Sequence, residues 1–261
     1  MPKVTRPDGA EIAWYEQGDG PPVVLASIGY ADPALLGGLA EDLARDHRVL
    51  SYDTRGSGVS SRTGPYDIST DSGDLLAVLE DAGAAAAAAV GNGDGANRAV
   101  KAAAQRPDLI GPVVVPGNLS LPVAASGAEG LSSSGSVLKG LVMLLENDYR
   151  AGVHAFVSSG NPGLGEDVIH ERVELIVAHC TQEASVGRIR SWIADDPTAE
   201  ARALGDRLWL LHHEANPWFT KQAGARKVLP DAHHEEVADG PMARPDLTAA
   251  FVREVTRTAA R

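Results

Sequence analysis

Two short stretches of the chain carry residue types and spacings that suit chemistry. Residues 91–95 have the sequence Gly-Asn-Gly-Asp-Gly, in which small residues surround one amide and one carboxylate. Two histidine pairs, 212–213 and 233–234, lie near the end of the chain. Because an imidazole titrates near neutral pH, His234 is a candidate general acid or base. The carboxylate of Asp94 is a candidate catalytic group or a cap for the helix that follows it.

Histidine pairs also bind metal ions, but no cluster of carboxylates at metal-ligand spacing accompanies these two. We therefore expect no metal ion and no cofactor, and we expect His212 and His213 to be packing or loop residues at a strand end. The single cysteine, Cys180, excludes an internal disulfide and is typical of a small buried side chain in a reducing compartment.

The composition is that of an ordinary globular protein with a large negative charge. Of the 261 residues, 44% are hydrophobic and 22% are charged, and the net charge is −12. A nucleic-acid-binding surface needs clustered lysine and arginine, so we expect no nucleic acid partner and no binding to anionic membranes. The chain has neither a signal peptide's apolar stretch in residues 1–20 nor an apolar run that could span a membrane. We expect a soluble, cytoplasmic protein.

Strand and helix patterns alternate along most of the chain, which predicts an α/β fold with a mostly parallel central sheet flanked by helices. Residues 117–202 break this alternation with a Gly/Ser-rich piece and then helical patterns. We therefore expect a core made of residues 1–116 and 203–261, with a helical cap insertion over 117–202. The expected strands are 23–26, 47–52, 84–90, 111–115 and 207–211, and the expected helices are 35–45, 69–82, 96–105 and 245–258.

Residues 53–60, Asp-Thr-Arg-Gly-Ser-Gly-Val-Ser, directly follow one of these buried strands. The string resembles a loop of the α/β-hydrolase superfamily, and residues 91–95 resemble the family's G-x-S-x-G elbow between a strand and a helix. Residues 208–218 resemble the strand and loop that carry the triad acid, and residues 229–234 resemble the loop with the triad histidine. The resemblance covers nearly the whole chain except the insertion.

This resemblance implies that the nucleophile position is Gly93, because Gly91 and Gly95 then occupy the small positions of the elbow. A shifted frame would make Asp94 the nucleophile and would place Asn92 and Ala96 in those positions, which suits the family pattern less well. The acid position is Asn216, and only the histidine survives, as His234. Acyl transfer through a covalent intermediate needs an oxygen or sulfur nucleophile, which glycine lacks.

Other parts of a family site are retained on this resemblance. The backbone N–H groups of Asp94 and of the loop Ser27, Ile28, Gly29 and Tyr30 are expected to form the oxyanion hole beside Gly93. Trp218 follows the acid position and is a candidate pocket wall. We expect Asp53 and Arg55 to hold their loop by hydrogen bonds rather than to act in catalysis.

These observations lead to a main functional hypothesis and two alternatives. The main one is an enzyme without a serine nucleophile that performs a cyclisation, lyase or carbon–carbon bond-forming step on a small substrate of specialised metabolism. It would use His234 as general acid or base and Asn216 to orient the ring. The alternatives are a non-catalytic small-molecule-binding protein and a hydrolase whose water His234 activates directly. Apolar residues in 137–145 and 173–179 favour a hydrophobic ligand, and the candidate assembly is a homodimer.

Overall fold

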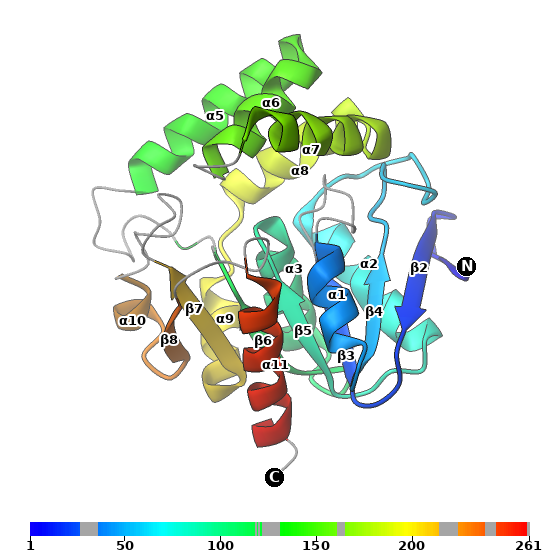
Figure 1. Cartoon of the computed structure of the whole chain (residues 1–261), viewed down its shortest axis with the longest axis vertical. Coiled ribbons are helices and arrows are strands. Elements are labelled where there is room, and N and C mark those ends of the chain that lie inside the picture. The colour runs from blue at the N-terminus through cyan, green and yellow to red at the C-terminus, as the bar shows by residue number, and fades with distance from the viewer. Residues whose placement is uncertain are drawn as a thin grey trace.

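The chain folds around one eight-stranded sheet with the strand order β1-β2-β4-β3-β5-β6-β7-β8 (Figure 1). This computed structural model describes residues 1–26, 36–117, 119, 121, 131–160, 165–213, 224–237 and 244–259, without the side chains of 131–138 and 213. The pairs β1–β2 and β2–β4 are antiparallel and the other pairs are parallel. The strands are β1 (Lys3–Thr5), β2 (Glu11–Gln17), β3 (Pro22–Ala26), β4 (Arg48–Tyr52), β5 (Ala87–Gly91), β6 (Ile110–Val115), β7 (Leu208–His213) and β8 (His233–Val237).

Helices cover both faces of this sheet, as the alternating sequence pattern predicts. One face packs against α1 (Gly37–Leu43) and α11 (Pro245–Ala259), which lie side by side in front of the strands in Figure 1. The other face packs against α2 (Ile68–Asp81), α3 (Asp94–Gln105), α9 (Thr198–Leu204) and α10 (Ala225–Val228). A short 3-10 turn, Gly205–Arg207, leads from α9 into β7. The predicted α/β class and its main elements are confirmed.

Four further helices form a layer above the carboxyl ends of the central strands (Figure 1). They are α5 (Leu131–Asn147), α6 (Tyr149–Gly160), α7 (Glu166–His179) and α8 (Gln182–Ala194). This layer has an apolar cluster of its own, which also includes Tyr66 from the segment before α2 and Ile68, the first residue of α2. The apolar residues of α5 and α7 that we expected to face a ligand are in part used here, since Leu145, Val173 and Ile176 are buried in this cluster.

The alanine-rich strand β5 shows how composition and position together decide a local structure. Alanine favours helix, but all five residues of β5 are buried between β3 and β6. Their small side chains let α3 approach the sheet closely. A Cβ atom at Gly91 would lie 2.6 Å from the Cα of Ala96, so only glycine fits there without a shift. This close approach fixes the start of α3 directly over the end of β5.

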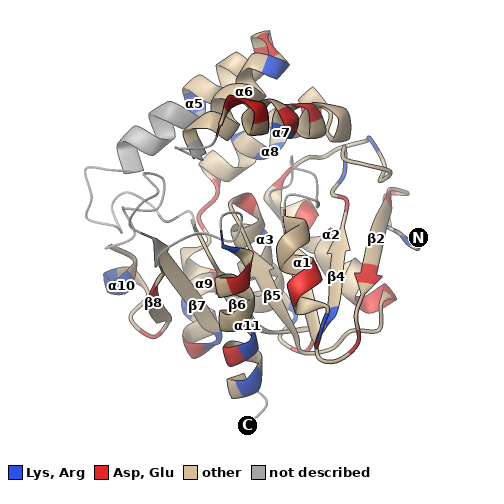
Figure 2. Cartoon of the chain, in the orientation of Figure 1, with Lys and Arg blue, Asp and Glu red and all other residues tan. Residues whose placement is uncertain are grey.

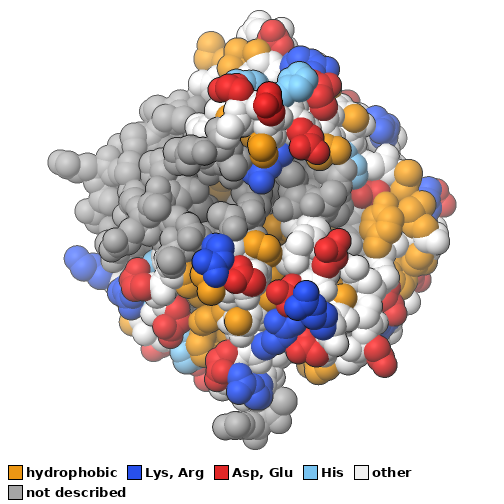
Figure 3. Space-filling view, in the orientation of Figure 1, with side chains coloured by type: hydrophobic (Ala, Val, Ile, Leu, Met, Phe, Trp, Pro, Cys, Tyr) orange, Lys and Arg blue, Asp and Glu red, His pale blue; other side chains and the backbone are white. Residues whose placement is uncertain are grey.

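The described surface carries charges of both signs, with no basic stripe along any described helix (Figure 2). The space-filling view likewise shows acidic, basic and apolar side chains interspersed on one face (Figure 3). Among the described residues, no helix has the length and apolarity needed to cross a bilayer.

A buried ion pair joins the upper helical layer to the core. Arg188 of α8 donates from Nε to Asp71 Oδ2 of α2 over 2.6 Å and from Nη2 to Oδ1 over 3.3 Å. Its Nη2 also donates to the backbone carbonyl of Arg55. Both charged side chains are at most 1% exposed. Because a buried charge that loses its partner is costly, this pair fixes α8 against α2.

We expect Arg188→Met to lower the free energy of unfolding by about 3–5 kcal/mol, because it leaves the Asp71 carboxylate buried without its partner. The matched control is Arg190→Met on the same helix. Arg190 pairs with Glu146 and its side chain is 61% exposed, so its loss should cost less than about 1 kcal/mol. Urea denaturation followed by circular dichroism measures both changes, and equal losses would contradict this role for Arg188.

Candidate functional site

The turn between β5 and α3 has the geometry of a sharp strand-to-helix elbow. Gly91 ends the strand, Asp94 begins the helix, and Gly93 stands between them with φ 60° and ψ −129°. Backbone N–H groups of Gly95 and Ala96 donate to the carbonyls of Asn92 and Gly93 over 3.0 Å each. An L-residue rarely adopts the φ and ψ angles of Gly93. The tip of the turn is therefore Gly93, and Asp94 lies within the helix.

The carboxylate of Asp94 is buried in the protein interior. Its side chain is 1% exposed, and its Oδ2 lies 3.4 Å from Arg98 Nη2 one turn further along α3. Arg98 Nη1 also donates to the hydroxyl of Tyr52 over 3.4 Å. Burial raises the pKa of Tyr52 to about 12, so this hydroxyl stays protonated. The expectation that Asp94 caps α3 is wrong, because the cap residue is Gly93 and no side chain bonds there.

His234 lies in a strand and not in a loop, which corrects our expectation for residues 229–234. It is the second residue of β8, paired with Leu210 of β7. The sequence His-His-Glu-Glu-Val has no apolar alternation, so it gave no strand signal. Through the register of β6 and β7, His234 stands level with Gly91. Three strand spacings separate β8 from β5, which amounts to about 14 Å.

Both ring nitrogens of His234 are engaged inside this part of the structure. Nε2 lies 2.9 Å from the carbonyl oxygen of Leu229, the C-cap residue of α10, and Nδ1 lies 2.8 Å from His212 Nε2. A carbonyl only accepts, so a neutral His234 carries its proton on Nε2 and accepts at Nδ1 from His212. Burial, and to a smaller extent the neighbouring His234 imidazole, lowers the pKa of His212 to about 4.

Comparison with solved structures finds the same architecture over almost the entire chain. A bromoperoxidase from Bacillus anthracis is 18% identical and has a TM-score of 0.78, with 96% of this chain and 95% of that chain covered. The enol-lactonase from Burkholderia xenovorans LB400 is 20% identical with a TM-score of 0.75, and both chains are covered completely. An alpha/beta hydrolase from Sphaerobacter thermophilus is 25% identical with a TM-score of 0.69, covering 98% and 100% of the two chains.

The chain has the α/β-hydrolase fold. Comparisons with family models and with curated proteins find no match. The likeness at these identities concerns the fold, and the chemistry has to be argued from the site itself.

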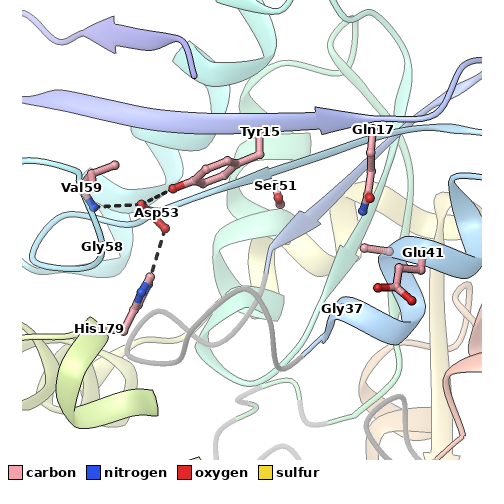
Figure 4. Close-up of a pocket in the computed structure, with 10 residues that line it drawn as sticks. Tyr15, Gln17, Gly37, Glu41, Ser51, Asp53, Gly58, Val59 and His179 are labelled. Carbon is pink, nitrogen blue, oxygen red and sulfur yellow. Dashed lines mark hydrogen bonds and ion pairs between the residues drawn. The ribbon is translucent and has the colours of Figure 1, made fainter. Parts of the chain in front are cut away.

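Within this α/β-hydrolase fold, the loop of residues 53–60 is held by its own polar side chains. Asp53 Oδ2 accepts from the hydroxyl of Tyr15 over 2.7 Å and from the N–H of Val59 over 3.0 Å (Figure 4). Arg55 donates to both carboxylate oxygens of Asp74 on α2 over 2.7 and 3.0 Å. The prediction that Asp53 and Arg55 hold the loop is confirmed.

The α/β-hydrolase fold also brings the end of α7 onto this loop. The N–H of Gly58 donates to the carbonyl of His179 over 2.8 Å, and the N–H of Thr181 donates to Gly56 over 2.9 Å. The His179 ring then reaches Asp53, with 3.5 Å between Nε2 and Oδ1 (Figure 4). Sequence reasoning missed His179 and Tyr15, because their partner Asp53 is distant along the chain and no local pattern marks them.

Several predicted site residues lie outside the described residues. They are Ser27, Ile28, Gly29, Tyr30, Asn216 and Trp218.

Among the described residues, no group of three or more potential ligand side chains is arranged to hold a metal ion. Cys180 is buried and accepts from the hydroxyls of Ser57 and Ser185 over 3.4 Å each, as expected for a packed thiol.

The elbow geometry predicts a cost for any side chain at Gly93. Gly93→Ala should lower the free energy of unfolding by about 1–3 kcal/mol, because alanine would be forced into the positive φ of the tip. Gly140→Ala is the matched control, since Gly140 lies within α5 with open space around it. That substitution should stabilise the helix by roughly 0.5–1 kcal/mol. Chemical denaturation measures the free energy of unfolding of both variants. An unchanged value for Gly93→Ala would contradict the positive φ of Gly93.

The histidine pair predicts an acid-sensitive contribution to stability. The unfolded chain binds a proton at His212 near pH 6.5, whereas the folded protein binds it only near pH 4. Stability from this group is therefore complete above pH 6.5 and falls as the pH drops towards 4. The expected loss between pH 7 and pH 5 is about 2 kcal/mol.

His212→Gln keeps an N–H donor and removes the titration, so its stability should fall less over this pH range than that of the wild type. His170→Gln, an exposed change on α7, should follow the wild type. Urea midpoints at the two pH values give the comparison. Parallel curves for wild type and His212→Gln would refute the assigned protonation.

Proposed function

We propose that this chain is an α/β-hydrolase-fold protein that binds a small molecule without forming a covalent intermediate. The observation that carries the proposal is the elbow, whose tip is Gly93 at φ 60° and ψ −129°. By the resemblance stated above, this is the place of the family nucleophile. Glycine has no side-chain oxygen or sulfur that could attack a carbonyl group, so a neighbouring base cannot generate a nucleophile at this position. A ligand that binds beside this elbow would therefore not pass through the covalent step of a serine hydrolase.

The position of His234 supports binding over the proton-transfer chemistry that the sequence favoured. A general base must come within hydrogen-bond reach of the proton that it takes, about 2.6–3.2 Å or one water away. His234 lies three strands from β5 and bonds Leu229 and His212 through its two nitrogens. Residues 238–243, which follow β8, contain no histidine. A cyclase, lyase or water-activating role based on His234 is therefore the less favoured proposal.

Asp94 supports the same conclusion. A carboxylate that replaced the missing nucleophile would have to face a pocket, but this one is 1% exposed and paired with Arg98. The enol-lactonase and the bromoperoxidase share the fold of this chain, but neither Gly93 nor the buried Asp94 offers a nucleophile for a covalent step. We propose a small organic ligand for this site, with the core over 1–116 and 203–261 and the cap over 117–202 as its two walls.

Ester turnover tests the proposal most directly. Hydrolysis of p-nitrophenyl acetate by the wild type should match that of His234→Gln within about twofold, because no catalysed step passes through that ring. Gly93→Ser should not react with a fluorophosphonate probe, since a serine is reactive only beside a base that takes its proton.

Two results would contradict the proposal and indicate that the protein is a hydrolase. One is a wild-type rate that falls by about tenfold or more in His234→Gln. The other is fluorophosphonate labelling of Gly93→Ser, which would reveal a base next to the elbow. Circular dichroism of both variants ensures that a lost signal does not come from unfolding.

A further inference from the structure

A cleft of about 480 Å³ lies between α1 and the β2–β4 pair, on the face of the sheet that α1 and α11 cover (Figure 4). Its described lining comes from β2, β4, the loop after β4, α1 and the end of α7. None of the described lining residues belongs to the elbow, and β3 separates β4 from β5 in the sheet. The described lining of the cleft therefore shares no residue with the described residues of the elbow, 91–96.

Strand register places the polar side chains of the cleft on one face. Tyr15 of β2 pairs with Ser51 of β4, and alternate residues of a strand point to the same side. Gln17, two residues after Tyr15, and Asp53, two residues after Ser51, continue the two rows. Figure 4 shows Gln17 with Glu41 of α1 at one end of the cleft and Asp53 with His179 at the other.

Asp53 forms a buried acceptor at the second end. Its side chain is only 1% exposed, and Oδ2 already accepts two hydrogen bonds, from Tyr15 and Val59. Its Oδ1 accepts no hydrogen bond from the described residues, and the His179 ring lies 3.5 Å away, which makes an ion pair when the imidazole is protonated. A buried carboxylate that lacks part of its hydrogen bonding favours a nearby positive charge or donor.

The rest of the lining favours the same kind of group. Glu41 is exposed at the rim and adds a second carboxylate, while the described lining contains no lysine or arginine. Gln17 and Ser51 supply neutral oxygen acceptors. The ring of Tyr15 is partly exposed, and an aromatic face attracts a cation. Two acidic ends, joined by acceptors and an aromatic ring, suit an elongated ligand with a positive charge at each end.

We propose that this cleft binds a small aliphatic diamine, with one ammonium group at Glu41 and Gln17 and the other towards Ser51 and Asp53. The inference does not rest on the proposed function of the elbow. Amine binding is measured at the cleft, whereas ester turnover and fluorophosphonate labelling are measured at Gly93. A negative result for the diamine proposal therefore does not affect the proposal for the elbow, and the reverse also holds.

Calorimetric titration of the whole protein with 1,4-diaminobutane tests the inference. We expect a dissociation constant of about 1 mM or tighter, and binding that weakens as salt is added. Butane-1,4-diol has the same length without the charge and should give no measurable heat. Glu41→Gln should weaken diamine binding by about tenfold. The matched control Glu171→Gln, an exposed carboxylate on α7 away from the cleft, should bind as the wild type does.

Three results would overturn the inference. They are the absence of diamine binding, equal binding by Glu41→Gln and Glu171→Gln, and binding of the diol as strong as that of the diamine. Site-specific NMR adds an independent readout, because diamine should shift the ring signals of Tyr15 and His179 and leave the Trp209 indole unchanged. Trp209 lies in β7, on the far side of the elbow strand.

Discussion

Three fully buried guanidinium groups impose the strongest constraint on this structure. Among the described residues, Arg55, Arg98 and Arg188 are the largest fully buried side chains, and each needs a carboxylate in the interior. Two of these carboxylates stand one turn apart on α2, which must therefore lie where the loop after β4 and the upper helices can both reach it. The pairs are Arg55–Asp74, Arg188–Asp71 and Arg98–Asp94. Any arrangement that separates a pair leaves a buried charge uncompensated.

This constraint also shapes the elbow. The first residue of α3 pairs with Arg98 inside the protein, and the residue before it is a glycine. The tip of the turn thus has the positive φ that suits glycine, and the carboxylate next to it, Asp94, pairs with Arg98 in the core. Arg188 further fixes α8 to α2. Separating these two helices would leave a guanidinium group buried without its carboxylate partner, which costs free energy in a protein interior.

Signals that lie close together in the sequence predicted most of the fold. Short apolar runs followed by helical periods mark β3 to β7 and their helices, and the small residues around Gly93 predicted the tip of the elbow. Features that depend on distant partners gave no such signal. His179 meets Asp53 only because the end of α7 docks on the loop after β4. The strand β8 was missed because its residues are polar, and its His233 is held by stacking on Trp209 at 3.6 Å.

That polar strand has a consequence for self-association. It forms one rim of the sheet, and its outward side chains include the exposed carboxylates of Glu235 and Glu236. The opposite rim is β1, only three residues long and with Lys3 exposed. Charged or very short outer strands resist pairing with the sheet of another molecule, and a net charge of −12 adds repulsion between copies. A homodimer of this protein would therefore use helical surfaces as its interface, and its sheet would not continue into the sheet of the partner.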